Sequence, residues 1–317
     1  MNLKKKAAGA DEHIVAVALD DVMVYGFFVL VHSLAKNAHA PFRLLVGHFT
    51  SRLSEANQKL IVAFLHELGI ENEMLELTPH PLFTERRHLT ITTFSKFVIS
   101  DQIAAPHLWL DLDTVAREGW DDIFTPLFAA TDSTSLVVAE KLESPHTRFD
   151  GFNAGVLGWT RAKRADWVPA LASLPEKRFS SEQYLFNTLY SAAFEKVDVR
   201  FNFLSSWHEQ RPQLERASII HFSGPIKPWH LLRRHTKAWE RINPSWAAWF
   251  AAEKTMLDGS QSAMLAKPIQ HLARQALFSG RLHTGKGALA GWFMRMLVIL
   301  GPLGDPLVWM LQRRSPQ

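Results

Sequence analysis

The chain has no cysteine and no apolar segment at its N-terminus. Without thiols its 317 residues can form neither disulfides nor thiolate metal sites, which is compatible with a reducing compartment. The first thirteen residues carry Lys4, Lys5 and Lys6 and lack the apolar core of a secretory signal. We therefore expect a cytoplasmic protein without disulfides.

An excess of basic residues is absent from most of the chain. Residues from Lys254 onward hold eight basic and two acidic side chains, so this segment has a formal charge of +6 and residues 1–253 have −2. A nucleic-acid-binding domain would be expected to carry a basic stripe over its folded body. We therefore expect no nucleic-acid partner.

Short apolar runs alternate with helical patterns in the first eighty residues. Strands are predicted at His13–Leu19, Phe42–Gly47 and Glu73–Leu77, with helices over Val22–Lys36 and Ser54–Leu68 between them. This alternation predicts an α/β fold with a mostly parallel central sheet flanked by helices, whose ligands lie beyond the carboxyl ends of the strands. Further strands are expected at Leu136–Ala139, Ala154–Trp159 and Lys196–Val199, and a helix over Ser180–Ser191. No Gly/Ser linker precedes residue 253, so one catalytic domain is predicted over residues 1–253.

The segment 254–317 has a different character. Asp258–Ser262 resembles a hinge, Pro268–Leu282 has the pattern of a basic amphipathic helix, and Ala288–Leu311 is apolar but interrupted by charged residues and prolines. A spanning helix needs about 20 predominantly apolar residues. We therefore interpret this helical C-terminal tail as a membrane-association segment that lies in the interface. The alternatives are a helical hairpin packed on the body and a partner-binding helix.

Two segments carry residues suited to metal chemistry. The apolar run His107–Leu110 is followed by Asp111, Leu112 and Asp113. Side chains two apart on an extended chain point to the same side, so the two carboxylates can face one cation, although such a pair is also common at solvated strand ends. A second segment, His221–Trp229, adds an imidazole, a Gly-Pro turn and a lysine.

Five separated segments together resemble the retaining family 8 glycosyltransferases, which include glycogenin and bacterial lipopolysaccharide galactosyl- and glucosyltransferases. The resemblance spans roughly His13 to Trp239 and implies a GT-A type nucleotide-sugar-binding fold. The segments are Ala18–Asp21, Arg87–Phe94, Leu110–Asp113, Phe152–Val156 and His221–His230.

The resemblance implies roles for particular residues. Asp111, Asp113 and His221 would ligate manganese, with magnesium as the alternative, and the ion would hold the diphosphate of the donor. Lys227 would place a second cation on the phosphates, and Gly224 would let the backbone approach them. The further donor-binding residues would be Ala18, Leu19, Asp20, Arg87, Lys96, Leu112, Asn153, Ala154 and Gly155, with Asp111 shared.

The resemblance assigns the reacting face to Glu182 and Gln183. Glu182 replaces a more frequent aspartate, Tyr184 replaces a common second acid, and Val22 stands where the family has a polar residue. An amide is a poor nucleophile, so we favour same-face attack with Gln183 stabilising positive charge, while double displacement stays open. The leaving phosphate can accept the proton of the acceptor hydroxyl in the same-face route.

The sequence therefore predicts a metal-dependent retaining hexosyltransferase at the inner face of the cell membrane. It would move galactose or glucose, or alternatively a uronic acid, from a UDP-sugar to a glycan or glycolipid acceptor, either lipopolysaccharide core or an exopolysaccharide on a lipid carrier. A nucleotidyltransferase is the second candidate, although no glycine-rich phosphate loop follows the first strand. A catalytically degenerate nucleotide-sugar-binding scaffold is the third.

Overall fold

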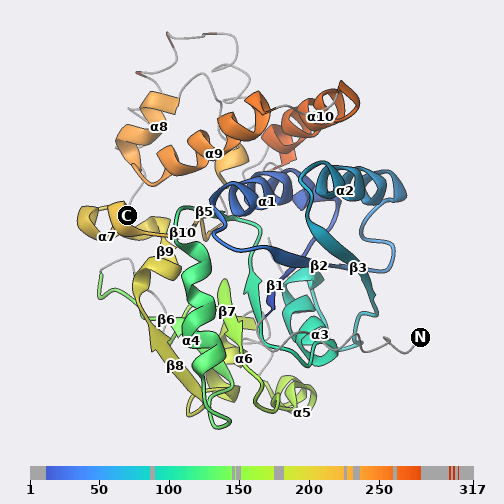
Figure 1. The fold of residues 1–317 in the computed structure, drawn as a ribbon, viewed down its shortest axis with the longest axis vertical. Helices are drawn as coiled ribbons and strands as arrows, with labels where there is room; N and C mark the ends of the chain where they lie inside the picture. Colours follow the sequence, from blue (N-terminus) through green and yellow to red (C-terminus); the bar gives the residue numbers. More distant parts are fainter. Residues whose placement is uncertain are drawn as a thin grey trace.

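The computed structural model describes residues 12–85, 90–144, 147, 151–174, 182–224, 227–230, 236–259 and 263–279, and single residues at 300, 303 and 306. Its described strands form one seven-stranded and one three-stranded sheet (Figure 1). The larger sheet, in spatial order, consists of β3 (Glu71–Leu77), β2 (Phe42–Phe49), β1 (His13–Ala18), β4 (His107–Leu110), β7 (Val156–Trp159), β6 (Leu136–Ala139) and β8 (Phe194–Val197).

Parallel pairing dominates the seven-stranded sheet. β1 lies parallel to both β2 and β4, β2 lies parallel to β3, and β6 lies parallel to β8. Only β7 reverses direction, because it runs antiparallel to β4 and to β6. The predicted α/β fold with a mostly parallel, helix-flanked sheet is confirmed.

Helices cover both faces of this sheet, and the alternation of side chains along β1 explains why. Val15 and Val17 are fully buried in the core on one face, and Ile14 and Ala16 are fully buried on the other. The first face is covered by α1 (Val24–Asn37), α2 (Glu55–Glu67) and α4 (Phe124–Ala129), and the second by α3 (Ser95–Gln102), α5 (Trp167–Ser173) and α6 (Glu182–Leu189).

The three-stranded sheet brings distant parts of the chain to the carboxyl end of β4. It has the order β5 (Thr114–Ala116), β10 (Ile219–His221) and β9 (Phe203–Leu204). β10 pairs antiparallel with β5, so that His221 lies opposite Thr114 and next to Asp113. Short helices lead into and out of these strands, namely α7 (Arg211–Arg216) and the 3-10 turns η4 (Val199–Phe201) and η5 (Ser205–Trp207).

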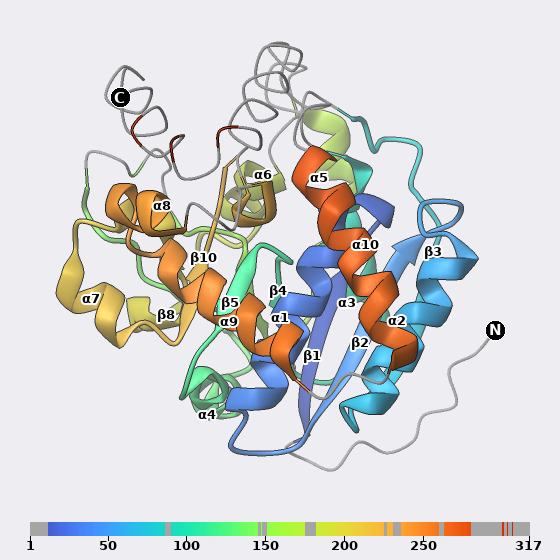
Figure 2. The same ribbon diagram turned by 90° about the horizontal axis from the view of Figure 1, so that it is seen from above.

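The C-terminal helices form an outer layer whose last two members pack on α1 and α2 (Figures 1 and 2). They are α8 (Thr236–Ile242), α9 (Trp246–Asp258) and α10 (Ala263–Ser279). α9 runs across the predicted boundary at residue 253 because both sides of that boundary are buried: Trp249 and Met256 are fully inaccessible, and the Glu253 carboxylate accepts a hydrogen bond from the Tyr25 hydroxyl at 2.6 Å. The helix therefore belongs to the body of the protein.

The predicted amphipathic helix of the tail exists, and its apolar face packs on the body. Leu265, Ile269, Ala273 and Ala276 of α10 are buried in the same core as α1. Of the predicted hinge, residues 260–262 lie outside the described part of the chain, as does nearly all of Ala288–Leu311. Among the residues described, no helix is long and apolar enough to span a membrane.

Candidate functional site

Asp20 lies immediately beyond the carboxyl end of β1, at one end of a pocket. Its carboxylate accepts a hydrogen bond from the backbone N–H of Val22 at 3.2 Å, which begins the 3-10 turn η1 (Asp21–Met23). The second carboxylate oxygen accepts hydrogen bonds from the hydroxyls of Thr90 and Thr92 at 3.3 and 3.2 Å. Asp20 is thereby held in one orientation although it is nearly inaccessible to solvent.

The two neighbouring carboxylates after β4 lie in the same pocket but in different surroundings. Asp111 accepts a hydrogen bond from the indole N–H of Trp109 at 2.8 Å and remains partly exposed. Asp113 is buried and pairs with the Lys227 ammonium. Burial would raise the pKa of Asp113, but the charges of Lys227 and His221 outweigh that effect and hold its pKa well below its ordinary value.

His221 completes a cluster with these two carboxylates. Its Nε2 lies 3.3 Å from Oδ1 of Asp113, because β10 pairs with β5 and the backbone N–H of Phe222 donates to the Asp113 carbonyl at 2.7 Å. One ligand atom from each of Asp111, Asp113 and His221 lies within 4.8 Å of the other two. The structure thus brings together the three predicted metal ligands.

The hydrogen bonds around His221 define which of its nitrogens can bind a cation. Nδ1 faces the side-chain oxygens of Asn153 at 3.0 Å and Asn202 at 3.2 Å. The Gly155 N–H donates to the same Asn153 oxygen at 3.0 Å, so that atom is the amide oxygen, and Nδ1 is the donor. With Nδ1 as the donor, Nε2 is the nitrogen that faces Asp113 and would be the one to bind a cation shared by the two.

Gly155 allows the His221 ring to lie where it does. A Cβ atom at this position would lie 2.1 Å from Cε1 of His221, closer than two carbon atoms can approach. The glycine of the Asn-Ala-Gly segment therefore has a steric role beside the predicted donor-binding role. The predicted strand Ala154–Trp159 accordingly begins only at Val156, after the turn that contacts His221.

Lys96 is a buried cation behind the pocket. Its side chain is about 1% exposed, and its ammonium lies 3.1 Å from Asp111, 3.4 Å from Glu182 and 3.1 Å from the Ala154 carbonyl. Burial alone would lower the pKa of Lys96, but the two carboxylates raise it above its ordinary value. Lys96 thus connects Asp111 to the start of α6 and does not itself line the pocket.

α6 begins at the predicted reacting face. Glu182 and Gln183 both line the pocket, and the Gln183 side-chain oxygen accepts a hydrogen bond from the Asn153 amide at 2.9 Å. Tyr184, the next residue, is exposed and lies outside the pocket lining.

The pocket has a volume of about 280 Å³ and contains most of the predicted residues. Leu19 differs from the prediction, since its side chain is fully buried in the core, and Ala154 contributes its carbonyl to Lys96. Arg87 lies outside the described residues. Predicted residues that line the pocket are Ala18, Asp20, Asp111, Leu112, Asp113, Asn153, Gly155, Glu182, Gln183, His221, Gly224 and Lys227.

Sequence reasoning missed several residues of this site. Thr90 and Thr92 lie in a segment that carried the resemblance but received no role, and Trp109 belongs to the apolar strand β4. Asn202 follows η4 and has no motif around it. Its function becomes visible only through the tertiary contact with His221.

The family of the protein follows from its sequence and agrees with this site. The model of the family described as Glycosyl transferase family 8 matches residues 14–232, which is more than half of the chain. The protein therefore belongs to glycosyltransferase family 8 and is a glycosyltransferase, as the resemblance predicted. No curated protein matched the chain in sequence.

Solved structures share the fold at low sequence identity. The galactosyltransferase LgtC, in complex with donor and acceptor sugar analogs, is 22% identical over 81% of this chain and 99% of its own, with a TM-score of 0.59. The glycosyltransferase GlyE of Streptococcus pneumoniae TIGR4 is 16% identical over 83% of this chain and 63% of its own, with a TM-score of 0.58. The fold is thus the GT-A fold of LgtC.

Proposed function

We propose that the protein is a metal-dependent, retaining hexosyltransferase that uses a UDP-sugar. The observation that carries this proposal is the convergence of Asp111, Asp113, His221 and Lys227 in one pocket with Gln183. Galactose or glucose is the proposed hexose, and the description of LgtC as a galactosyltransferase supports the former. The proposed acceptor is a hydroxyl of lipopolysaccharide core or of another cell-surface glycan.

The donor set of the cluster fits manganese, with magnesium as the alternative. Two carboxylates with one imidazole suit manganese better than calcium. When bound, such an ion would act as a Lewis acid that stabilises the negative charge of the departing diphosphate. Asp111, Asp113 and His221 would hold it, with Asn153 and Asn202 fixing the tautomer of His221.

The rest of the donor would contact other residues of the pocket lining. Asp20 and Ala18 would contact the nucleoside, with Thr90 and Thr92 holding the Asp20 carboxylate. Val22, which is apolar and partly exposed, leaves a ribose contact to other groups.

Lys227 and Gly224 would meet the diphosphate. Lys227 pairs with Asp113 in this structure. Once Asp113 ligates a cation, the ammonium becomes available to a phosphate. Gly224 adopts φ of 117°, a conformation that favours glycine and lets the backbone approach the ligand closely.

The sugar would lie against Asn153, Glu182 and Gln183. The Glu182 carboxylate is paired with buried Lys96, which would hold it in place to contact a sugar hydroxyl. We assign Gln183 to the stabilisation of positive charge at the anomeric carbon in same-face attack. A structure of LgtC is described as an active-site mutant in which a glutamine is changed to glutamate, which supports a role for this residue type.

The proposed location is the cytoplasmic face of the cell membrane, where such acceptors are assembled. Because the apolar face of α10 packs on the body, membrane contact would involve its exposed basic side chains Lys267 and Arg274 and the residues that follow Ser279. Basic side chains near an anionic surface contribute about 1 kcal/mol each.

The decisive experiment is incubation of the purified protein with a panel of UDP-sugars, with manganese or with a chelator. We expect release of UDP from one sugar, dependent on manganese and lost in Asp113→Asn. Asp132→Asn, which changes an exposed carboxylate that is not part of the pocket lining, is the matched control. Release of pyrophosphate would instead indicate a nucleotidyltransferase, and UDP-sugar binding without turnover, with or without an acceptor, a scaffold.

A further inference from the structure

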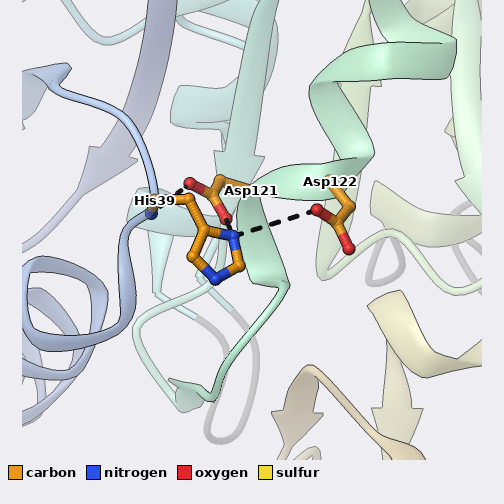
Figure 3. A group of neighbouring side chains, drawn as sticks. All are labelled: His39, Asp121 and Asp122. Carbon is orange, nitrogen blue, oxygen red and sulfur yellow. Dashed lines mark hydrogen bonds and ion pairs between the residues drawn. The ribbon is translucent and has the colours of Figure 1, made fainter.

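A second group of potential metal ligands lies at the opposite end of the central sheet. His39 follows α1 and precedes β2, and Asp121 and Asp122 belong to the 3-10 turn η3 (Trp120–Ile123) (Figure 3). The catalytic pocket lies beyond the carboxyl end of β1, whereas His39 precedes the amino end of its parallel neighbour β2. With six residues in β1, the two places are separated by roughly 20 Å of strand.

The three side chains point at a common centre (Figure 3). Nδ1 of His39 lies 3.2 Å from Oδ1 of Asp121 and 4.0 Å from Oδ1 of Asp122. One ligand atom from each of the three residues lies within 4.8 Å of the other two. Two ligands about 2.0–2.2 Å from one ion in tetrahedral geometry are roughly 3.3–3.6 Å apart. The observed separations are close to those that a single ion requires.

Asp121 supplies the observation that points to a cation. Its side chain is about 3% exposed, and its Oδ2 accepts the backbone N–H groups of His39 at 2.6 Å and Ala40 at 3.2 Å. Oδ1 is buried as well but has no hydrogen-bond partner within the described structure, because its contact with His39 lacks hydrogen-bond geometry. A buried carboxylate oxygen without a donor is costly, and a cation would satisfy it.

Asp122 is held so that one oxygen remains available. Arg200 donates from Nη2 to Oδ2 of Asp122 at 2.9 Å, which leaves Oδ1 directed toward His39. The two carboxylates and the one guanidinium leave a net negative charge around the centre. His39 is about 56% exposed, so water can complete the coordination from the solvent side.

We propose that His39, Asp121 and Asp122 bind a divalent transition-metal ion, for which zinc is the best match. Imidazole nitrogen together with carboxylate oxygen is a common zinc donor set, and calcium favours oxygen ligands alone. The ion would connect the loop after α1 to η3 and stabilise the amino-terminal edge of the sheet. It is independent of the metal of the transfer reaction.

Calorimetric titration with zinc chloride of chelator-treated Asp113→Asn protein tests this site apart from the catalytic one. We expect one bound equivalent, which His39→Ala removes on the same background and His66→Ala, at an exposed histidine of α2, preserves. Equal zinc binding with and without His39, or no binding at all, would overturn the proposal and leave His39 and Asp121 as an ion pair.

A thermal measurement on the otherwise unmodified chain gives a second readout that does not depend on Asp113. Zinc should raise the melting temperature of His66→Ala more than that of His39→Ala, because the cluster of Asp111, Asp113 and His221 remains intact in both variants. UDP release with manganese should be the same in both variants. An equal rise of melting temperature in both would refute the site even if the transferase activity is as proposed.

Discussion

Replacing Gly155 with alanine tests whether the His221 ring must lie against this glycine for the site to bind its metal. The new Cβ would lie 2.1 Å from Cε1 of His221, and an ordinary contact begins at 3.4 Å, so the ring must retreat by about 1.3 Å. Metal–ligand distances tolerate only about 0.2 Å. Gly155 itself has no positive φ, so its backbone accepts alanine and the ring is the obstacle.

The expected consequence is the loss of one of three protein ligands. Mutation of a residue that merely supports a ligand typically weakens metal binding 10–100-fold, so losing His221 should weaken it by at least ~100-fold, or about 2.7 kcal/mol. Calorimetric titration with manganese measures this affinity directly. The manganese concentration needed for half-maximal UDP release should rise by a similar factor.

Gly47→Ala provides the matched control. Its new Cβ would lie 2.3 Å from Cδ1 of Ile99, a comparable clash, but with the flexible end of an apolar side chain that is not part of the ligand cluster. This variant should lose stability without losing manganese affinity. If Gly155→Ala binds manganese as tightly as the parent protein, His221 is not a ligand in the position that the structure gives it.

Two substitutions and a pair of deletions test further features of the protein. Lys96→Met leaves the carboxylates of Asp111 and Glu182 without their buried cation. The free energy of unfolding, measured by urea denaturation, should fall by about 3–5 kcal/mol. A loss below about 1 kcal/mol would contradict a stabilising role of Lys96. Deletion after Asp258 removes the two large aliphatic side chains that α10 buries and should lower the free energy of unfolding by about 3–6 kcal/mol. Deletion after Ser279 should leave the melting temperature unchanged and reduce sedimentation with anionic vesicles. Equal melting temperatures of the two truncated chains would place α10 outside the core. Burial lowers the pKa of His107 to about 3, so as the pH falls below 6.5 this histidine takes up a proton in the unfolded chain before it does so in the folded one. The free energy of unfolding should therefore decline by up to about 1.4 kcal/mol per pH unit between pH 6.5 and 3. Urea titrations should show a shallower decline for His107→Leu.

Local sequence patterns were sufficient for the part of the site that lies at strand ends. Asp20 and Asp111 follow apolar runs, and the carboxyl ends of parallel strands meet at one edge of a sheet. His221 could be added because its segment resembles the family. These predictions depend on periodicity and motif, which are properties of neighbouring residues in the chain.

The positions that the sequence did not predict depend on tertiary packing. The period of an amphipathic helix reveals an apolar face but not what covers it, so α10 was expected at a membrane although Ile269 is buried against the body. Lys96 was expected as a cation near the donor, and only the fold shows that its ammonium is enclosed. Asn202 contacts His221 across 19 residues with no motif around it.

The charges around the ligand cluster explain why metal and donor should bind together. Asp111, Asp113 and Glu182 contribute three negative charges, while Lys96 and Lys227 contribute two positive ones. A diphosphate would therefore enter a site whose nearby charges already sum to a negative value. Ligation of a divalent ion by Asp113 would reverse that sum and would leave the Lys227 ammonium available to a phosphate. The same rearrangement thus prepares two positive groups for the phosphates, so each ligand should raise the affinity for the other by an equal factor.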